Sequence, residues 1–287
     1  MRGLGKSIAK AGSGLLVLLV GWWLLLFFSG HVERAYETLK PGELVVIGGK
    51  MVSIEEVAQK YQPRIFMPIG QESPPPLKMW YEVIRAGDDE LVLIYRPAWE
   101  NEKHPISWMH ILYSVFRASY YGYPLIDSEY IQVNVSTGDG LIRRLRFETG
   151  MTNNYNILVS KHLVATATRQ PNGDYLLIIN ERSGEIAATE VVSPLLLDGT
   201  RPCLGILTWN HLLVLREEGD RQYAKPVDME LVYLDEREYT RYKFARRSQG
   251  DYITPENKTG LFLAAAVIAV VAIRFTIWPL RRRRALF

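Results

Sequence analysis

The sequence of 287 residues contains a single cysteine, Cys203, so it can form neither an intrachain disulfide nor a zinc or haem site built on several cysteines. It also lacks the G-x-S-x-G, P-loop and G-x-G-x-x-G patterns. No catalytic nucleophile and no phosphate-binding loop can therefore be named from motifs.

Acidic residues are absent from both ends of the chain. All 31 Asp and Glu lie in 31–259, which also holds 26 of the 34 Lys and Arg, so this stretch carries a net charge of −5 although the whole chain is at +3. That balance differs from the basic surface of a nucleic-acid binder, and we expect no nucleic-acid partner.

Two apolar runs are long enough to be membrane spans. Residues 14–29 carry no charge, and 260–280 carry only Arg274. With their flanking small residues each reaches about 20 positions, the length that a helix needs to cross the hydrocarbon of a bilayer. Membrane lipid is therefore one expected partner.

The flanks of these runs predict their orientation. Basic residues precede the first run and fill 281–284 after the second, and cytoplasmic flanks are enriched in Lys and Arg. The predicted organisation is a cytoplasmic N-terminus (1–12), a transmembrane helix (13–30), an extracytoplasmic domain (31–259), a second transmembrane helix (260–280) and a cytoplasmic basic tail (281–287). The absence of disulfides from an exported domain favours a bacterial or archaeal plasma membrane.

The first run could instead be a cleaved signal peptide. Its apolar stretch is long, however, and no small-residue cleavage site follows Phe28, so an uncleaved anchor is favoured.

Three residues in the spans are candidates for partner contacts. Arg274 lies seven positions before Arg281, at a depth from which its side chain could reach the cytoplasmic headgroups, or else pair with another subunit. Trp22 and Trp23 lie in mid-span, away from the interface where tryptophan is usual, so they either pack on another helix or face lipid.

The domain between the spans is predicted to be β-rich and of the α+β class, an antiparallel sandwich or open barrel with one central amphipathic helix, flanked by the two transmembrane helices. Turn residues predict three hairpins, between 79–85 and 90–99, across 137–140, and across 171–174. Further strands are expected at 43–47, 156–168, 175–182, 186–192, 204–216 and 228–234, and a charged helix at 235–247.

Two further helices are predicted within this domain. Residues 53–56 (SIEE) form a capping box that starts a short helix ending near Tyr61. The central helix runs from Pro105 towards Gly122, with an apolar face and a polar stripe that includes His110, Ser114 and Arg117.

Asp127 and Glu129 are predicted to point into the core, because side chains alternate between the two faces along a strand. They share the parity of Ile131, Val133 and Val135, so the inward face of this strand begins with two carboxylates. A carboxylate at the rim of a core needs a partner, and Arg96, Arg117, Arg143 and Arg146 are the candidates. A structural ion pair of Arg117 with Asp127 or Glu129 is the most specific of these predictions.

The residues between 95 and 135 could also form a metal site. Oxygen and imidazole ligands suit Zn, Mn or Fe, although the spacing matches no known zinc motif. A solvated loop that caps the helix explains the same residues, so no cofactor is predicted and a divalent metal stays an alternative. Its candidate ligands are Glu100, Glu102, His104, His110, Asp127 and Glu129.

The other histidines, His31, His162 and His211, have no acidic or cysteine neighbour at ligand spacing and are expected to be packed or at the surface.

These features favour a non-enzymatic, doubly anchored membrane protein whose extracytoplasmic domain is a scaffold or binding module, as an accessory subunit of a larger membrane complex. One alternative is a membrane-anchored metal-dependent hydrolase that uses the Glu100 to Glu129 cluster. A third is a small oligomeric channel with two spans per subunit, which the shortage of polar positions in the spans disfavours.

Overall fold

The computed structural model describes residues 36–70, 75–100, 106, 110–111, 114, 126–150, 162–180, 186–192 and 195–241. Within these ranges no helix combines the length and the apolar character that a membrane span requires. The two predicted spans, with Trp22, Trp23 and Arg274, lie outside the described ranges, and so do both predicted cytoplasmic ends.

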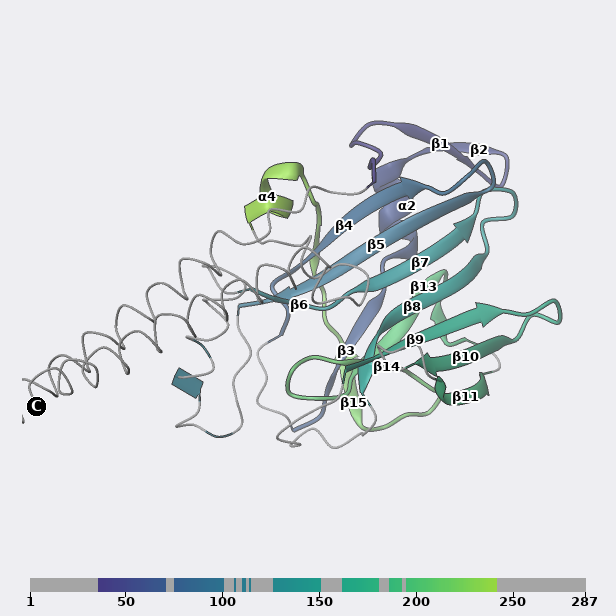
Figure 1. Cartoon of the computed structure of the whole chain (residues 1–287). Coiled ribbons are helices and arrows are strands. Elements are labelled where there is room, and N and C mark those ends of the chain that lie inside the picture. The colour runs from purple at the N-terminus through teal and green to yellow at the C-terminus, as the bar shows by residue number, and fades with distance from the viewer. Residues whose placement is uncertain are drawn as a thin grey trace, which may run out of the picture.

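A nine-stranded sheet forms the larger part of the described structure (Figure 1). Its order is β11-β10-β9-β8-β7-β5-β4-β16, with β6 paired to the end of β5. All neighbours are antiparallel except β16, which runs parallel to β4. The strands are β4 (Lys78–Arg85), β5 (Glu90–Trp99), β6 (Asp127–Ser128), β7 (Ile131–Ser136), β8 (Ile142–Gly150), β9 (His162–Arg169), β10 (Tyr175–Asn180), β11 (Ile186–Val192) and β16 (Glu230–Tyr233).

A smaller, five-stranded sheet packs against the larger one. Its order is β12-β13-β3-β15, with β14 on β13, and β13 runs parallel to β3. These strands are β3 (Arg64–Pro68), β12 (Leu197–Asp198), β13 (Arg201–Ile206), β14 (Leu213–Leu215) and β15 (Tyr223–Pro226). The remaining elements are the hairpin of β1 (Leu44–Ile47) and β2 (Lys50–Ser53) and the helices α2 (Ile54–Tyr61) and α4 (Glu236–Arg241).

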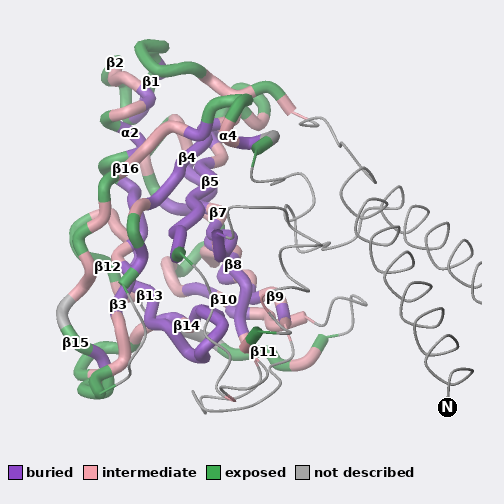
Figure 2. The backbone as a smooth tube through the Cα atoms, turned by 90° about the vertical axis from the view of Figure 1, so that its left-hand side faces the viewer, coloured by how far each residue is buried: buried purple, intermediate pink, exposed green. Residues whose placement is uncertain are grey.

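The core lies between the two sheets and is closed at one end by α2. Alternation along the central strands turns one apolar row inward, in which Tyr81, Tyr95, Ile131 and Phe147 follow one another across β4, β5, β7 and β8. Figure 2 shows these central strands as buried and the β1–β2 hairpin as largely exposed. Each fully buried large apolar side chain contributes about 1.5–3 kcal/mol, so this row is a main source of stability.

Helix α2 begins as the capping box predicts. The Ser53 hydroxyl accepts a hydrogen bond from the Glu56 amide at 3.2 Å, and the Ser53 amide donates to the Glu56 carboxylate at 2.9 Å. Val57, Ala58 and Tyr61 point into the core, and the Tyr95 hydroxyl donates to the Ala58 carbonyl at 2.7 Å. A local sequence signal thus fixes the start of a helix that the sheet then holds.

The described chain begins and ends along the same edge of β4. The Leu39 amide donates to the Val83 carbonyl at 2.8 Å, and β16 pairs with Lys78 to Tyr81 of that strand. The Thr38 and Tyr233 hydroxyls, which lie 2.9 Å apart, link the two segments. Helix α4 is fastened to the same strand, because the Trp80 indole donates to the Glu238 carboxylate.

The β-rich prediction is confirmed, and neither sheet closes on itself. The three predicted hairpins are present as β4–β5, β7–β8 and β9–β10. The all-antiparallel arrangement is wrong for two pairs, β16 with β4 and β13 with β3, because long connections bring each pair together in the same direction.

The single strand predicted for 204–216 is also wrong. The structure has two strands, β13 and β14, joined by a loop at 207–212 that is as buried as the strands on either side, although it contains Thr208, Asn210 and His211.

Most of the predicted central helix lies outside the described residues. Of its positions, 110, 111 and 114 are helical, and Ser114 Oγ lies 3.5 Å from His110 Nε2. That contact agrees with the predicted polar stripe, whereas Arg117 is not among the described positions.

Candidate functional site

The loop 207–212 carries the densest set of buried polar groups in the described structure. Thr208 and His211 are 0% and 1% exposed, and the loop is closed by a hydrogen bond of 2.6 Å from the Leu207 amide to the Leu212 carbonyl. His211 has a φ of 63°, a left-handed conformation that non-glycine residues rarely adopt. The loop therefore holds His211 against an intrinsic backbone preference.

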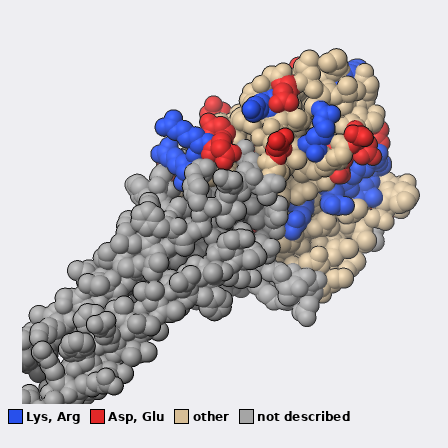
Figure 3. Space-filling model, turned by 45° about the horizontal axis from the view of Figure 1, so that its top comes forward, with Lys and Arg blue, Asp and Glu red and all other residues tan. Residues whose placement is uncertain are grey.

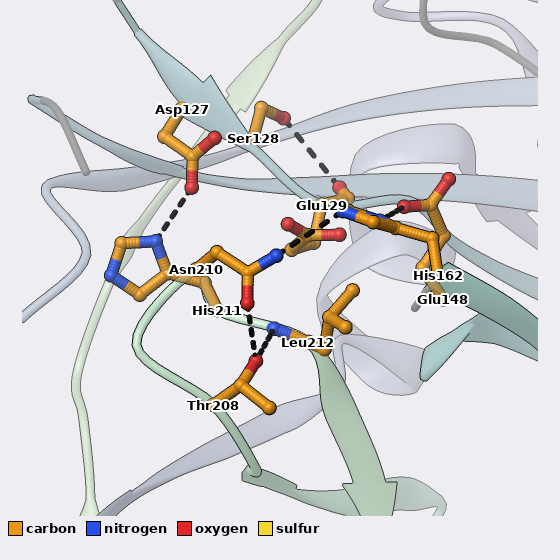
Figure 4. A network of polar contacts seen from close by, with 9 residues as sticks. All are labelled: Asp127, Ser128, Glu129, Glu148, His162, Thr208, Asn210, His211 and Leu212. Atoms are coloured by element: carbon orange, nitrogen blue, oxygen red, sulfur yellow. Dashed lines mark hydrogen bonds and ion pairs between the residues drawn. The ribbon is translucent and has the colours of Figure 1, made fainter. Parts of the chain in front are cut away.

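His211 lies over a cross-strand pair of the large sheet. Trp99 at the end of β5 is opposite Asp127 on β6. The His211 ring stacks on the Trp99 indole, with centroids 4.2 Å apart and planes 4° apart, while its Nδ1 lies 2.6 Å from Asp127 Oδ2 (Figure 4). One side chain from the small sheet thus joins two residues of the large sheet.

A second histidine completes the cluster from the other side. His162, the first residue of β9, has its Nδ1 3.2 Å from Glu148 Oε2 and its Nε2 3.2 Å from the amide nitrogen of Asn210. The Asn210 oxygen accepts from the Thr208 hydroxyl at 2.7 Å, and Thr208 Oγ1 accepts from the Leu212 amide at 3.2 Å.

The direction of this chain of hydrogen bonds indicates which ring nitrogen of His162 accepts and which donates. Because the Asn210 oxygen is occupied by the Thr208 donor, its amide nitrogen faces His162 and can only donate. Nε2 of His162 must then accept, which leaves the proton on Nδ1, where it is donated to Glu148. Each of these side chains then has a hydrogen-bond partner within the network.

The structure brings some of the predicted site residues to this cluster. Asp127 and Glu129 are 5% and 3% exposed, and the contact of Asp127 with His211 confirms the prediction that Asp127 turns inward. Glu100 is exposed just past β5, and Glu102 and His104 lie outside the described ranges. The pair of Arg117 with Asp127 or Glu129 stays a prediction, since Arg117 is not described either.

Two of the other candidate arginines have carboxylate partners of their own. Arg96 Nε lies 3.2 Å from Glu82 Oε2, and both side chains are fully buried. Arg143 pairs with Asp139, four residues earlier in the β7–β8 turn.

The Arg96–Glu82 pair belongs to a second polar network, on the face of the large sheet that points away from the main core. Tyr36 donates to Glu82 at 3.3 Å, and the Arg96 guanidinium lies 5.4 Å from the centre of the Tyr130 ring. Burial raises the pKa of both Tyr36 and Tyr130, so both phenols stay protonated and can donate. This network connects Tyr36, at the beginning of the described chain, to β4 and β5.

Within the described part of the chain, no three His, Cys, Asp or Glu side chains are grouped so that they could hold a metal ion. His110, Asp127 and Glu129 are included in that statement, whereas Glu102 and His104 are not. The metal alternative therefore rests on residues beyond the described ranges.

A histidine oriented by a carboxylate is the arrangement used by general bases and by metal ligands. Here the His211 side chain is only 1% exposed and is stacked on Trp99, so a ligand from solvent could reach it only if the loop opened. The Thr208 hydroxyl of the same cluster is already committed to Asn210. In this conformation the cluster connects the two sheets.

Four residues of this cluster are not indicated by the sequence: Glu148, His162, Asn210 and His211. The expectation that His211 is a packed histidine is confirmed by its burial. Its partner Asp127 is 84 positions away, so spacing carries no signal of the pair. A histidine and an asparagine inside an otherwise apolar stretch were the one available hint, because buried polar side chains require partners.

A comparison with known proteins finds no family model that matches the chain, no similar curated protein and no similar solved structure.

Proposed function

We propose that this chain is a non-enzymatic membrane protein anchored by two spans, 13–30 and 260–280, whose extracytoplasmic β-rich domain is a scaffold or binding module within a larger membrane complex. In this proposal the plasma membrane is bacterial or archaeal and both termini are cytoplasmic. Other membrane-protein subunits and lipid are its partners.

The observation that carries the proposal is that the two ends of the described chain lie beside the same edge of β4. Leu39 and β16 follow one another along a single edge of β4, and Thr38 contacts Tyr233 directly. Two membrane helices connected to this edge can leave the domain side by side, as a domain held to one membrane at both ends requires.

The buried cluster supports a binding module in preference to an enzyme. His211 and Asp127 are shielded from solvent, and the groups around them bond to one another across the two sheets. Removing one partner of a buried carboxylate is destabilising, so a role in stability is enough to explain these groups.

The surface charges support the expectation that nucleic acid is not a partner. On the face shown in Figure 3, basic and acidic side chains of the described part are interspersed and do not separate by sign. A nucleic-acid interface would gather the basic ones.

The proposal is tested by the set of proteins that co-purify from native membranes in mild detergents. We expect stable partners for the wild type, and fewer of them for Arg274→Leu, whose arginine is proposed to contact another subunit within the membrane. Arg281→Leu, in the basic tail, is the matched control and should keep all partners. A monomer in every detergent would refute the complex.

The hydrolase alternative is separated from this proposal by elemental analysis of the purified protein. Stoichiometric zinc, manganese or iron that is lost in a His104→Ala, His110→Ala variant would favour the hydrolase. Negligible metal, with the variant unchanged, would favour the binding module.

A further inference from the structure

The β1–β2 hairpin is a two-stranded sheet of its own at the surface of the domain (Figure 2). Val45 and Ile47 turn inward and belong to the core, whereas Leu44 and Val46 alternate with them and are 55% and 52% exposed. Met51, opposite Val46 on β2, is exposed on the same face. The hairpin therefore presents an apolar face to solvent.

Leu44 and Val46 also leave their main-chain groups open. Antiparallel neighbours alternate between pairs that exchange hydrogen bonds and pairs that do not. The Ile54 amide donates to the Glu43 carbonyl at 3.1 Å, so the bonded positions of β1 are the odd-numbered ones. The N–H and C=O groups of Leu44 and Val46 then point away from β2, and within the described part of the chain no hydrogen bond reaches them.

An open edge and an apolar face at the same two residues fit one kind of ligand, an extended peptide strand. Such a strand can bond to the outward main-chain groups of β1 while its alternate side chains cover Leu44 and Val46. A helix would cover the apolar face but leave the main-chain groups unpaired. Strand addition also extends the hairpin to three strands, the number from which small sheets become stable.

The size of the surface indicates which molecule supplies the strand. Three exposed apolar side chains cover far less than the about 800 Å² that each partner of a stable complex usually buries. A second copy of the chain held by this surface alone would dissociate, whereas a strand from a subunit of the same complex is kept at high local concentration. We propose that the β1 edge binds an extended apolar segment of another subunit of the membrane complex, an inference that rests on the proposed function.

Strand binding is tested with the full chain in detergent and a fluorescein-labelled peptide in which valine alternates with threonine. Fluorescence anisotropy should show saturable binding of this peptide, and none of the same peptide with every amide N-methylated, because that peptide has no N–H donors. Val46→Pro removes one outward donor and leaves the bonded positions of β1 intact, so it should weaken binding by about two- to ten-fold. Equal binding of both peptides, or binding of neither, would overturn strand addition.

A second variant tests the site without a proline. Leu44→Lys removes apolar surface and places a lysine on the edge, where lysine disfavours strand pairing, so it should weaken binding by about ten-fold or more. Ile69→Lys, at another exposed apolar position just past β3, is the matched control and should bind the peptide as the wild type does. Equal unfolding midpoints show that both variants are folded. Unchanged affinity in Leu44→Lys would overturn the site.

The native complex identifies the partner and separates this inference from the proposed function. Among the proteins that co-purify from native membranes, one subunit should be lost in Leu44→Lys and kept in Ile69→Lys. The same partners in both variants would overturn the assigned occupant, and so would capture of untagged copies of the chain by tagged ones if Leu44→Lys abolishes it. A chain that is monomeric in every detergent yet binds the peptide would refute the complex and this occupant, and would support the strand-binding edge alone.

Discussion

His211 joins the two sheets through a single side chain, since its ring stacks on Trp99 at 4.2 Å and its Nδ1 lies 2.6 Å from Asp127. Trp99 and Asp127 are opposite each other on β5 and β6 of the large sheet, while His211 comes from the loop between β13 and β14. We infer that this histidine is the main polar connection between the layers.

The His211→Ala variant should therefore be strongly destabilised, by about 3–5 kcal/mol, because removing one partner of a buried pair leaves the carboxylate of Asp127 poorly compensated. The matched control is His162→Ala. The carboxylate partner of His162, Glu148, is buried too, but the His162 side chain is 29% exposed, so water can replace it and a smaller loss of about 1–3 kcal/mol is expected. Chemical denaturation of the full chain in detergent, followed by tryptophan fluorescence, measures both. Equal losses would contradict the special role of His211.

Glycine should be tolerated better than alanine at position 211. The φ of 63° costs an L-residue about 1–2 kcal/mol, a penalty that glycine escapes. His211→Gly should accordingly be about 1 kcal/mol more stable than His211→Ala, although both lose the ring. The same denaturation experiment compares the two, and a less stable glycine variant would show that the loop relaxes out of the left-handed conformation.

Local patterns predict local structure in this chain. The Ser53–Glu56 capping box and the turn between β4 and β5 depend on residues close in sequence, and both are found where predicted. The inward orientation of Asp127 follows from strand parity alone and is likewise confirmed by burial.

The sequence does not predict which residues and strands pair over long distances along the chain. The partner of Asp127 is 84 residues away, and β3 adjoins β13 across more than half of the described chain. The stretch around His211 is predicted as part of one strand, whereas in the structure Thr208 bonds to Asn210 and to the Leu212 amide within a loop. Such hydrogen bonds depend on the tertiary fold and produce no periodic pattern in the sequence.

The Glu82–Arg96 pair should behave as a coupled unit. Both side chains are fully buried, and their closest atoms lie 3.2 Å apart, so Glu82→Gln or Arg96→Met alone leaves a charge in the sheet at a cost of about 3–5 kcal/mol. The double variant removes both charges and should be destabilised by clearly less than the sum of the single ones. Additive losses in denaturation of the four proteins would rule out direct coupling.

The domain should unfold in alkali. Burial raises the pKa of Tyr61, Tyr81 and Tyr223 to about 12, against an ordinary value of 10.0. Because the folded-state pKa is the higher one, this contribution to stability is complete below pH 10 and is lost as the pH rises towards 12.

Absorbance at 295 nm reports tyrosinate during such a titration, and circular dichroism reports the fold. We expect part of the tyrosinate signal to appear only together with unfolding, between about pH 10 and 12. Tyr61→Phe, which also loses the hydrogen bond to the Gly140 carbonyl, should shift that part of the signal. Complete ionisation near pH 10 with an intact fold would contradict the buried positions.

The orientation of the chain is the central claim, and single-cysteine labelling tests it most directly. Met51 is 68% exposed on β2, and the native Cys203 is buried, with its thiol pKa raised by that burial, so it should add little background. A membrane-impermeant maleimide applied to intact cells or spheroplasts should label Met51→Cys at once. Ser7→Cys and Ala285→Cys should react only after the membrane is permeabilised. Labelling of either terminal cysteine from outside, or protection of Met51→Cys until permeabilisation, would contradict a domain held outside the membrane by two spans.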